Sequence, residues 1–186
     1  MGSEMCIRDS MDADTNFFKV FGLPLCWQID LKVLKEKHRS LQKDFHPDLF
    51  VNSSEVEKQR SVEKASVINE GFRVLCSPLS RAQHLLELHG CNANDENAIS
   101  SDTSFLMKQL EYRELLAKIP ESENPFSEVD AFRDKIEHEY VSLQQLFASM
   151  IQKKQLEDAK ISFSKMQFFS KLLDQISLTE QKIEDF

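Results

Sequence analysis

Apolar residues recur three or four positions apart along every long segment of this chain, which is the spacing of one face of an α-helix. Only four glycines and five prolines occur among the 186 residues, so few positions can interrupt long helices. The chain contains no internal repeat and no low-complexity tract. The sequence therefore predicts an all-α protein.

The balance of apolar and charged residues indicates a globular chain. Hydrophobic residues make up 41% and charged residues 29%, which is too apolar for a disordered chain and too polar for a membrane protein. No apolar run approaches 18 residues, so we expect no membrane partner. The net charge of -8 and the pI near 5.2 disfavour nucleic acid as a partner.

The charge is distributed unevenly along the sequence. Residues 31–45 contain five basic and two acidic residues, whereas residues 111–139 contain nine acidic and four basic ones. These regions suggest two different partner surfaces, although each could simply be a solvated helix face.

The four cysteines, Cys6, Cys26, Cys76 and Cys91, include no C-x-x-C pair and no zinc-type spacing with histidine. Their pattern predicts free thiols in a reducing compartment, and we expect neither a metal site nor a cofactor. Residues 1–10 lack the apolar core of a secretion signal and do not make a transit peptide. A cytoplasmic location is therefore expected.

A polar, Asn-rich run at residues 91–101 has no helical periodicity and is the predicted domain boundary. We expect residues 1–10 to be a flexible or non-native leader without fold information. The remaining chain divides into an N-terminal domain at residues 11–90 and a C-terminal domain at residues 102–186.

The first domain is predicted to contain an antiparallel helical hairpin. A short Phe-rich helix ends at Gly22, and Asp30 is the expected N-cap of the next helix. That helix must end before Pro47, because the residue before a proline avoids the α region. Ser53 or Ser54 can cap the following helix. The two apolar stripes expected to face each other are Leu31, Leu34, His38, Leu41 and Phe45, and Val62, Ala65, Ile68, Phe72 and Leu75.

A short helix over residues 80–89 completes the first domain, and three helices follow in the second. The first of these spans residues 102–119 and stops near Pro120. A variant capping box, Ser127 to Asp130, is expected to open the next helix. The stripes predicted to form a three-helix bundle continue with Val129, Phe132, Ile136, Tyr140, Leu143, Phe147 and Met150, and with Ala159, Phe163, Met166, Phe169, Leu173, Ile176 and Ile183.

The tripeptide His46-Pro47-Asp48 lies at the predicted hairpin loop, directly after the basic helix. Alone it would occur by chance in about one chain in a hundred of this length. His46 and Asp48 could simply cap helices, or they could act as an acid–base pair in a hydrolase. Little supports a hydrolase, because the sequence shows no second carboxylate cluster, no metal spacing and no Gly-rich phosphate loop.

The sequence on both sides of this loop resembles the J domain of DnaJ-type co-chaperones. The matching segments are NFFKVFGLP, LKEKHRSLQKDFHPDLF and KASVINEGFRVLCSPLSRAQHLL. In the second half, FLMKQLEYRELL resembles the client-binding helix of one subfamily, the HscB co-chaperones of iron–sulfur cluster assembly. The resemblance covers residues 11–186 and implies a J domain followed by a three-helix bundle.

The resemblance implies that the loop and the preceding basic helix dock onto an HscA/DnaK-type chaperone and stimulate its ATPase. Pro47 would fix the loop, Asp48 would offer a carboxylate to a partner arginine, and His46 would supply a donor and an acceptor. The basic residues expected to steer the chaperone are Lys35, Lys37, Arg39 and Lys43. Members of this subfamily usually carry lysine where this chain has Leu49, so we expect one charge fewer and a lower affinity.

Helical periodicity separates two faces of the helix over residues 102–119. The predicted buried face consists of Phe105, Tyr112, Leu116 and Ile119. The predicted exposed face consists of Met107, Leu110, Glu111 and Glu114, with Leu106 at its edge. An apolar patch with an acidic rim is typical of a protein-binding surface, although Met107 and Leu110 could instead pack on another helix.

In the HscB family the matching positions bind the iron–sulfur scaffold protein, so the resemblance implies an IscU-type scaffold as the second partner. The scaffold-binding residues that it implies are Leu106, Met107, Leu110, Glu111, Glu114 and Phe168. Lys118 stands where relatives often have an acid, so the acidic rim is expected to be thinner. Animal relatives carry an N-terminal cysteine-rich metal motif that this chain lacks, which favours a bacterial cytoplasmic protein over a mitochondrial one.

These observations predict a co-chaperone without an active site of its own. It would hold the scaffold on its second domain and the ATPase chaperone on its first, and thereby aid cluster assembly and transfer. The alternative is a J-domain co-chaperone for a different client.

Overall fold

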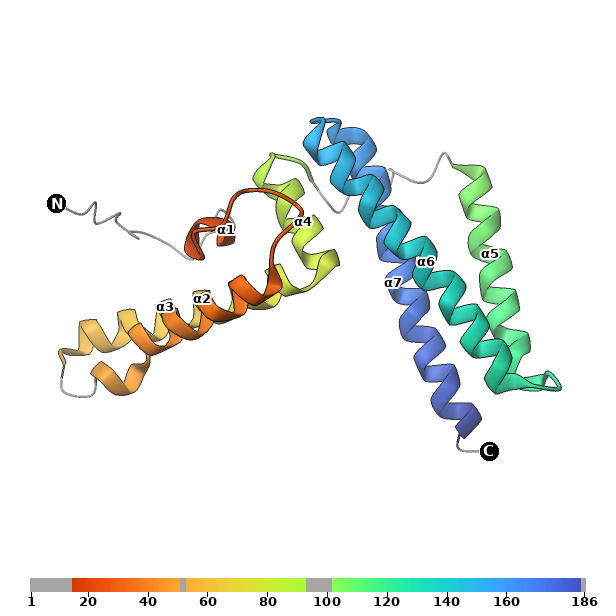
Figure 1. Ribbon diagram of the computed structural model, residues 1–186, viewed down its shortest axis with the longest axis horizontal. Helices are drawn as coiled ribbons and strands as arrows, with labels where there is room; N and C mark the ends of the chain where they lie inside the picture. Colours follow the sequence, from red (N-terminus) through yellow and green to blue (C-terminus); the bar gives the residue numbers. More distant parts are fainter. Residues whose placement is uncertain (1–14, 51–52, 93–101, 185–186) are drawn as a thin grey trace. The chain divides into compact units, whose positions relative to one another are not determined.

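The computed structural model describes residues 15–50, 53–92 and 102–184. The leader predicted at residues 1–10 and most of the predicted boundary lie outside these described residues. The described chain is all-helical, which confirms the predicted fold class (Figure 1). It forms two compact units: the first holds the chain up to Leu75 except for Cys26–Ile29, and the second holds Cys26–Ile29 together with the chain from Cys76 onward.

Two long helices, α2 (Leu31–Asp44) and α3 (Glu55–Cys76), lie antiparallel and form the predicted hairpin of the first unit (Figure 1). The Asp30 carboxylate accepts hydrogen bonds from the backbone N–H groups of residues 32 and 33, so the predicted N-cap is confirmed. Ser54 caps α3, because its N–H donates to the Glu57 carboxylate and its hydroxyl accepts from the Glu57 N–H. The remaining elements of the unit are α1 (Phe17–Val20) and the 3-10 helix η1 (Pro47–Phe50).

The core of the first unit forms where α1 lies against the hairpin. Its buried apolar residues include Phe18, Phe21, Leu34, Ile68 and Leu75. Gly71 on α3 permits the close approach of α1, because a Cβ atom there would lie 2.8 Å from Phe17 Cδ1 and 3.0 Å from Phe21 Cε2. The short helix α1 therefore packs against α3 at Gly71, a residue that has no side chain.

Two members of the predicted hairpin stripes are exposed. Leu31 is 44% exposed and Val62 is 56% exposed, whereas Ser61 and Gly71 on α3 are buried. The periodicity of apolar residues predicts which face of a helix is buried. It does not predict how far along the helix the neighbouring helix packs. These two assignments were therefore wrong at the ends of otherwise correct stripes.

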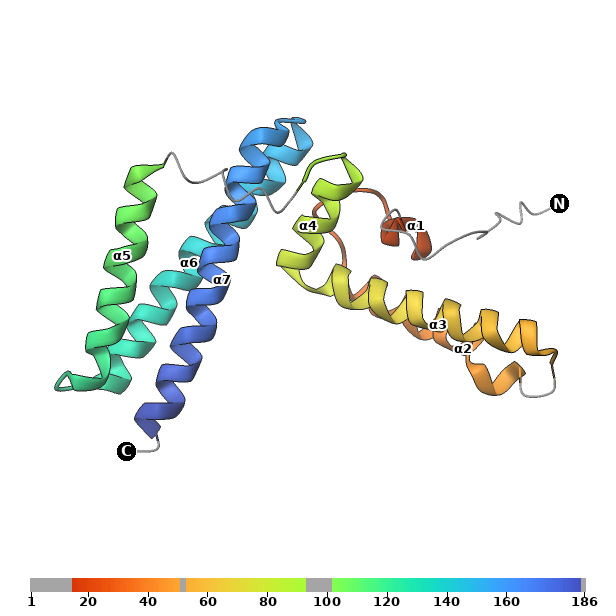
Figure 2. The same cartoon turned by 180° about the vertical axis from the view of Figure 1, so that it is seen from behind.

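The second unit contains two long antiparallel helices that pack along each other (Figures 1 and 2). Its elements are α4 (Pro78–Leu88), α5 (Thr103–Lys118), the 3-10 helix η3 (Ile119–Glu121), α6 (Pro125–Gln152) and α7 (Leu156–Glu184). A tight turn joins α6 to α7, with Lys154 at φ 58° and a hydrogen bond from the N–H of Gln155 to the carbonyl of Met150. Among the described residues, no helix combines the length and apolar character needed to span a membrane.

The core between α5, α6 and α7 follows the predicted stripes closely. Its buried residues are Phe105, Tyr112, Leu116, Ile119, Val129, Phe132, Ile136, Phe169, Leu172, Ile176 and Ile183. Leu172, which was not predicted, is buried in this cluster, whereas the predicted Tyr140, Leu143 and Leu173 are only partly buried against it.

The predicted start of α6 was wrong. The helix begins at Pro125, ahead of the expected capping box at Ser127, and its N-cap Asn124 makes no side-chain capping hydrogen bond. Proline is well suited to the first helical position, since its missing N–H would have no intrahelical partner there. The helix α4 also begins with a proline, Pro78, after the N-cap Ser77. It therefore starts slightly before the helix predicted over residues 80–89.

By packing, α4 belongs to the second unit. The Trp27 ring is 9% exposed and lies edge-on to Phe147 of α6, with 5.1 Å between ring centroids. The guanidinium of Arg81 on α4 lies 4.6 Å above the same indole. The packing boundary therefore falls at residues 75 and 76, while the functional division into residues 11–90 and 102–186 stays a prediction.

Candidate functional site

The His46–Asp48 loop is exposed at the end of α2. The last helical residue is Asp44, and the Phe45 N–H still donates to the Leu41 carbonyl. The side chains of His46 and Asp48 are 57% and 83% exposed, and His46 Nδ1 lies 3.5 Å from Asp48 Oδ2. The Asp48 N–H donates to His46 Nδ1 at 3.3 Å, so the loop is held by its own residues while the carboxylate faces solvent.

The basic face of α2 leads to this loop. Lys35, Arg39 and Lys43 are exposed and follow one another at spacings of four residues, so they lie along one side of the helix. Together with the loop they make an exposed, positively charged surface, which we call the basic loop surface. Such a surface steers a partner of opposite charge.

Lys37 differs from the other three basic residues, because it has a partner inside the unit. Its Nζ donates to the backbone carbonyls of Phe21 at 2.7 Å and Gly22 at 2.8 Å. These carbonyls directly follow α1, where the negative end of the helix favours a cation. The spacing along α2 could not reveal this contact, since the acceptors lie 15 and 16 residues earlier.

The predicted faces of α5 are confirmed by burial. The four residues assigned to the inner face are all buried. On the outer face Met107 is 64% exposed, Leu110 is 54% exposed and Leu106 is 40% exposed, and Glu111 and Glu114 are exposed beside them. Met107 and Leu110 therefore do not pack on another helix among the described residues.

One further apolar residue extends this outer face. Leu115 is 39% exposed and lies one turn after Glu111. It flanks the patch on the side opposite to Leu106, at 100° per residue. Periodicity could have identified it, because it lies outside the buried stripe. We call the set Leu106, Met107, Leu110, Glu111, Glu114 and Leu115 the α5 outer face.

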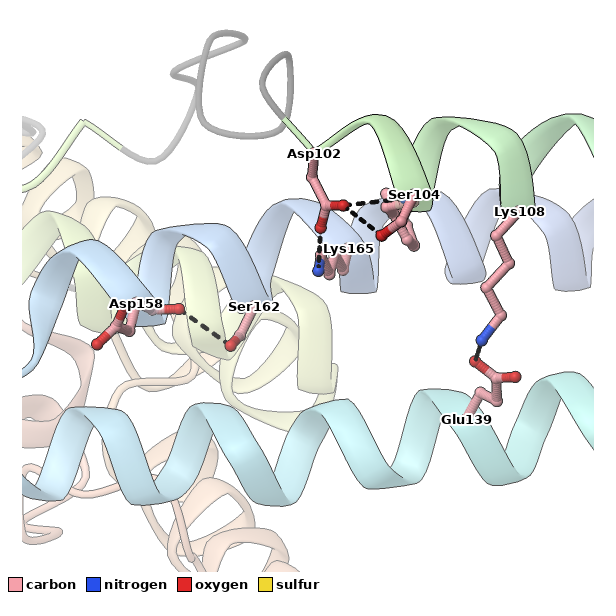
Figure 3. Close-up of polar contacts among 8 residues, drawn as sticks. Asp102, Ser104, Lys108, Glu139, Asp158, Ser162 and Lys165 are labelled. Atoms are coloured by element: carbon pink, nitrogen blue, oxygen red, sulfur yellow. Dashed lines mark hydrogen bonds and ion pairs between the residues drawn. The ribbon is translucent and has the colours of Figure 1, made fainter.

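Polar contacts at the beginning of α5 fix it against α7 (Figure 3). The Asp102 carboxylate accepts from the Phe105 N–H at 3.0 Å, and from Lys165 Nζ of α7 at 2.7 Å. The bond from Lys165 is the main cause that holds the pKa of Asp102 well below its usual range, and the bonds from Ser104 and the Phe105 N–H add to it. The cap therefore also serves as a link between two helices.

Further along, α5 is fixed against α6 (Figure 3). Lys108 Nζ lies 2.6 Å from Glu139 Oε2, and the Tyr112 hydroxyl donates to Glu139 Oε1 at 2.5 Å. Burial alone would raise the pKa of Glu139, yet the bonds from Lys108 and Tyr112 bring it below its ordinary value. Burial, followed by the bond to Glu139, raises the pKa of Tyr112. These links set the rotation of α5 and keep its outer face toward solvent.

Phe168, the remaining predicted scaffold contact, is packed rather than free. Its ring on α7 lies edge-on to Phe105, with 5.5 Å between centroids, and the Arg113 guanidinium lies 5.9 Å above it. The side chain is half-buried at the margin of the core. Only part of Phe168 is therefore accessible to a partner.

The described residues contain no group of three or more His, Cys, Asp or Glu side chains that could hold a metal ion. Cys26, Cys76 and Cys91 form no disulfide bond among the described residues, and Cys6 lies outside them. The features that the structure exposes for function are thus the basic loop surface and the α5 outer face.

Comparisons with known proteins agree with this arrangement. Residues 101–177 match the family described as "HSCB C-terminal oligomerisation domain". The chain is 35% identical to the co-chaperone protein HscB homolog of Shewanella pealeana, over 91% of this chain and 99% of that protein.

Solved structures extend the agreement to the fold. The chaperone HscB from Vibrio cholerae superposes with a TM-score of 0.83 at 31% identity, covering 91% of this chain and 99% of that chain. The human co-chaperone protein HscB superposes with a TM-score of 0.80 at 26% identity, covering 91% and 84%. These structures combine a J domain with a helical C-terminal domain. The chain therefore belongs to the HscB family of co-chaperones.

Proposed function

We propose that this protein stimulates the ATPase of an HscA/DnaK-type chaperone through its basic loop surface and binds an IscU-type iron–sulfur scaffold protein through its α5 outer face. The observation that carries the proposal is that one chain exposes both surfaces, with opposite charge and on different compact units. Its relatives are named co-chaperones, which supports a helper role without an active site.

The loop would act by direct contact with the chaperone. Asp48 is the most accessible polar group of the loop and can accept a charge-assisted hydrogen bond from an arginine of the partner. Lys35, Arg39 and Lys43 would raise the rate of encounter with an acidic surface and would act less at high salt.

The α5 outer face would hold the client. Its central methionine and leucine can adapt to an apolar depression on the scaffold, and Glu111 and Glu114 can pair with basic residues around it. Because both partners would be held on one chain, the client would reach the chaperone at a raised local concentration.

A steady-state ATPase assay with the chaperone of the same organism tests the first part. We expect the wild-type protein to stimulate turnover, and His46→Gln or Asp48→Asn to abolish the stimulation while the circular dichroism spectrum stays unchanged. The absence of stimulation by the wild type, or full stimulation by His46→Gln, would refute a J-protein role. If stimulation is present but calorimetry detects no binding of the scaffold, a J-domain co-chaperone for a different client would replace the iron–sulfur role.

A further inference from the structure

An open groove lies beside the His46–Asp48 loop. Its volume is about 450 Å³, and it is lined by Arg39, Gln42, Lys43, His46 and Leu49. All of these residues come from the second half of α2 or from the loop and η1 directly after it. The groove therefore belongs to the same unit as the basic loop surface and is continuous with it.

Leu49 provides the apolar part of this groove. Its side chain is 65% exposed, and its N–H donates to the His46 carbonyl at 3.0 Å, so the turn of η1 fixes its position. The leucine is thus presented to solvent by a hydrogen-bonded turn beside the residues proposed to bind the chaperone. An exposed apolar side chain in such a place is a feature of a binding surface.

The surface that lines the groove is mainly apolar, although Arg39 and Lys43 are among the lining residues. The amide of Gln42 donates to Asn69 Oδ1 of α3 at 3.0 Å, so its polar end is engaged within the hairpin. Arg39 and Lys43 can contribute their apolar methylene stems to this surface while their charged ends stay in water. The groove is therefore complementary to an apolar side chain that has carboxylates next to it.

We propose that the ATPase chaperone stimulated by this protein places an apolar side chain, flanked by acidic residues, in this groove against Leu49. The inference rests on the function proposed above and adds the chemistry of the partner surface. It assigns to Leu49 a role in partner specificity, so that the leucine adds affinity where a lower affinity was expected from the missing lysine.

The test is a titration of the chaperone's ATPase with the full-length protein and its Leu49 variants. We expect Leu49→Ala and Leu49→Lys to raise the half-maximal concentration about tenfold, which corresponds to about 1.4 kcal/mol, and to leave the maximal rate unchanged. Leu49→Met, which keeps an apolar side chain of similar volume, should stay within about twofold of the wild type. Val56→Ala, at an equally exposed apolar position in the first turn of α3, is the matched control and should change nothing.

Repeating the titration at high salt distinguishes an apolar contact from an electrostatic one. The tenfold effect of Leu49→Ala should persist at 0.5 M salt, roughly a Debye length of 4 Å, while the effect of Lys43→Ala should shrink. Tighter half-maximal binding by Leu49→Lys, or wild-type behaviour of both the alanine and the lysine variants, would overturn the assignment of the groove. If His46→Gln stimulates as well as the wild type does, the proposed function fails and this inference fails with it.

Discussion

At the scale of single residues, Lys37 shows how a charge can be used inside its own domain. It lies among the basic residues of α2, yet its ammonium group binds the carbonyls that follow α1. The sequence predicts the exposure of Lys35, Arg39 and Lys43 correctly, because a solvated helix face requires only local spacing. It cannot distinguish Lys37 from them, because the contact depends on how α1 packs against the hairpin.

Replacement of Lys37 should therefore affect stability rather than docking. We expect Lys37→Met to lower the free energy of unfolding by about 1–2 kcal/mol, since two carbonyls lose a charged donor. The matched variant Lys43→Met should leave stability unchanged and weaken the stimulation of the chaperone at low salt. Urea unfolding and ATPase titration check both variants, and wild-type stability with weakened stimulation by Lys37→Met would assign Lys37 to the docking surface instead.

The apolar residues of the α5 outer face should carry most of the affinity for the scaffold. We expect the combined replacement of Leu106, Met107 and Leu110 by alanine to cost about 1–3 kcal/mol of binding free energy. Leu178→Ala on α7 removes a leucine that is 57% exposed elsewhere on the same unit and should not change the affinity. Calorimetry with the purified scaffold decides the matter, and equal affinity of the triple variant and the wild type would reject this surface.

At the scale of elements, α5 depends on polar links at its first turns. Asp102 is both the N-cap of α5 and the partner of Lys165, and these bonds lower its folded-state pKa. A lowered pKa means that the contribution to stability is fully present above the pKa of the unfolded chain, near 4, and is lost progressively as the pH falls toward the folded-state pKa.

The variant Asp102→Asn tests this link. The difference in unfolding free energy between the wild type and Asp102→Asn should be largest at pH 6 and should shrink as the pH falls from about 4 to 2. Asp134→Asn, at an exposed position on α6, should show no comparable trend. Urea unfolding at several pH values measures the difference, and a difference that does not depend on pH would show that the ionised carboxylate contributes nothing.

The packing of α1 against Gly71 of α3 gives a second prediction at the scale of elements. Gly→Ala within a helix usually stabilises by about 1 kcal/mol, but at Gly71 the new methyl group would meet Phe17 at 2.8 Å. We expect Gly71→Ala to destabilise the protein by about 1–3 kcal/mol through overpacking. Ser66→Ala, at an exposed position on the same helix, serves as the control in thermal unfolding. An increase in stability for Gly71→Ala would mean that α1 is not firmly seated.

The elements also show what local sequence can predict. Helix ends were predicted correctly where the signal is a stop, as at Gly22 and Pro47, or a side-chain cap, as at Asp30. The start of α6 was missed because Pro125 begins a helix through its backbone geometry, without a side-chain cap. The faces of α5 were predicted correctly from periodicity alone, whereas the contact of Lys165 with Asp102 spans 63 residues and has no local signal.

At the scale of the whole molecule, the protein consists of two units with different surfaces. The first unit carries the basic loop surface and the second carries the α5 outer face. Joining two binding modules in one chain can give each partner an effective concentration in the millimolar range relative to the other, without any new contact. The α5 outer face would thus act on turnover only through the client that it holds.

The most direct measurement is ATP turnover by the chaperone with this protein, with the scaffold, and with both together. We expect turnover with both to exceed the sum of the two separate effects. The triple alanine variant of the α5 outer face should keep its own stimulation and lose this excess, and His46→Gln should lose both. Turnover equal to the sum, or an excess that survives the triple replacement, would contradict the claim that one chain brings the client to the chaperone.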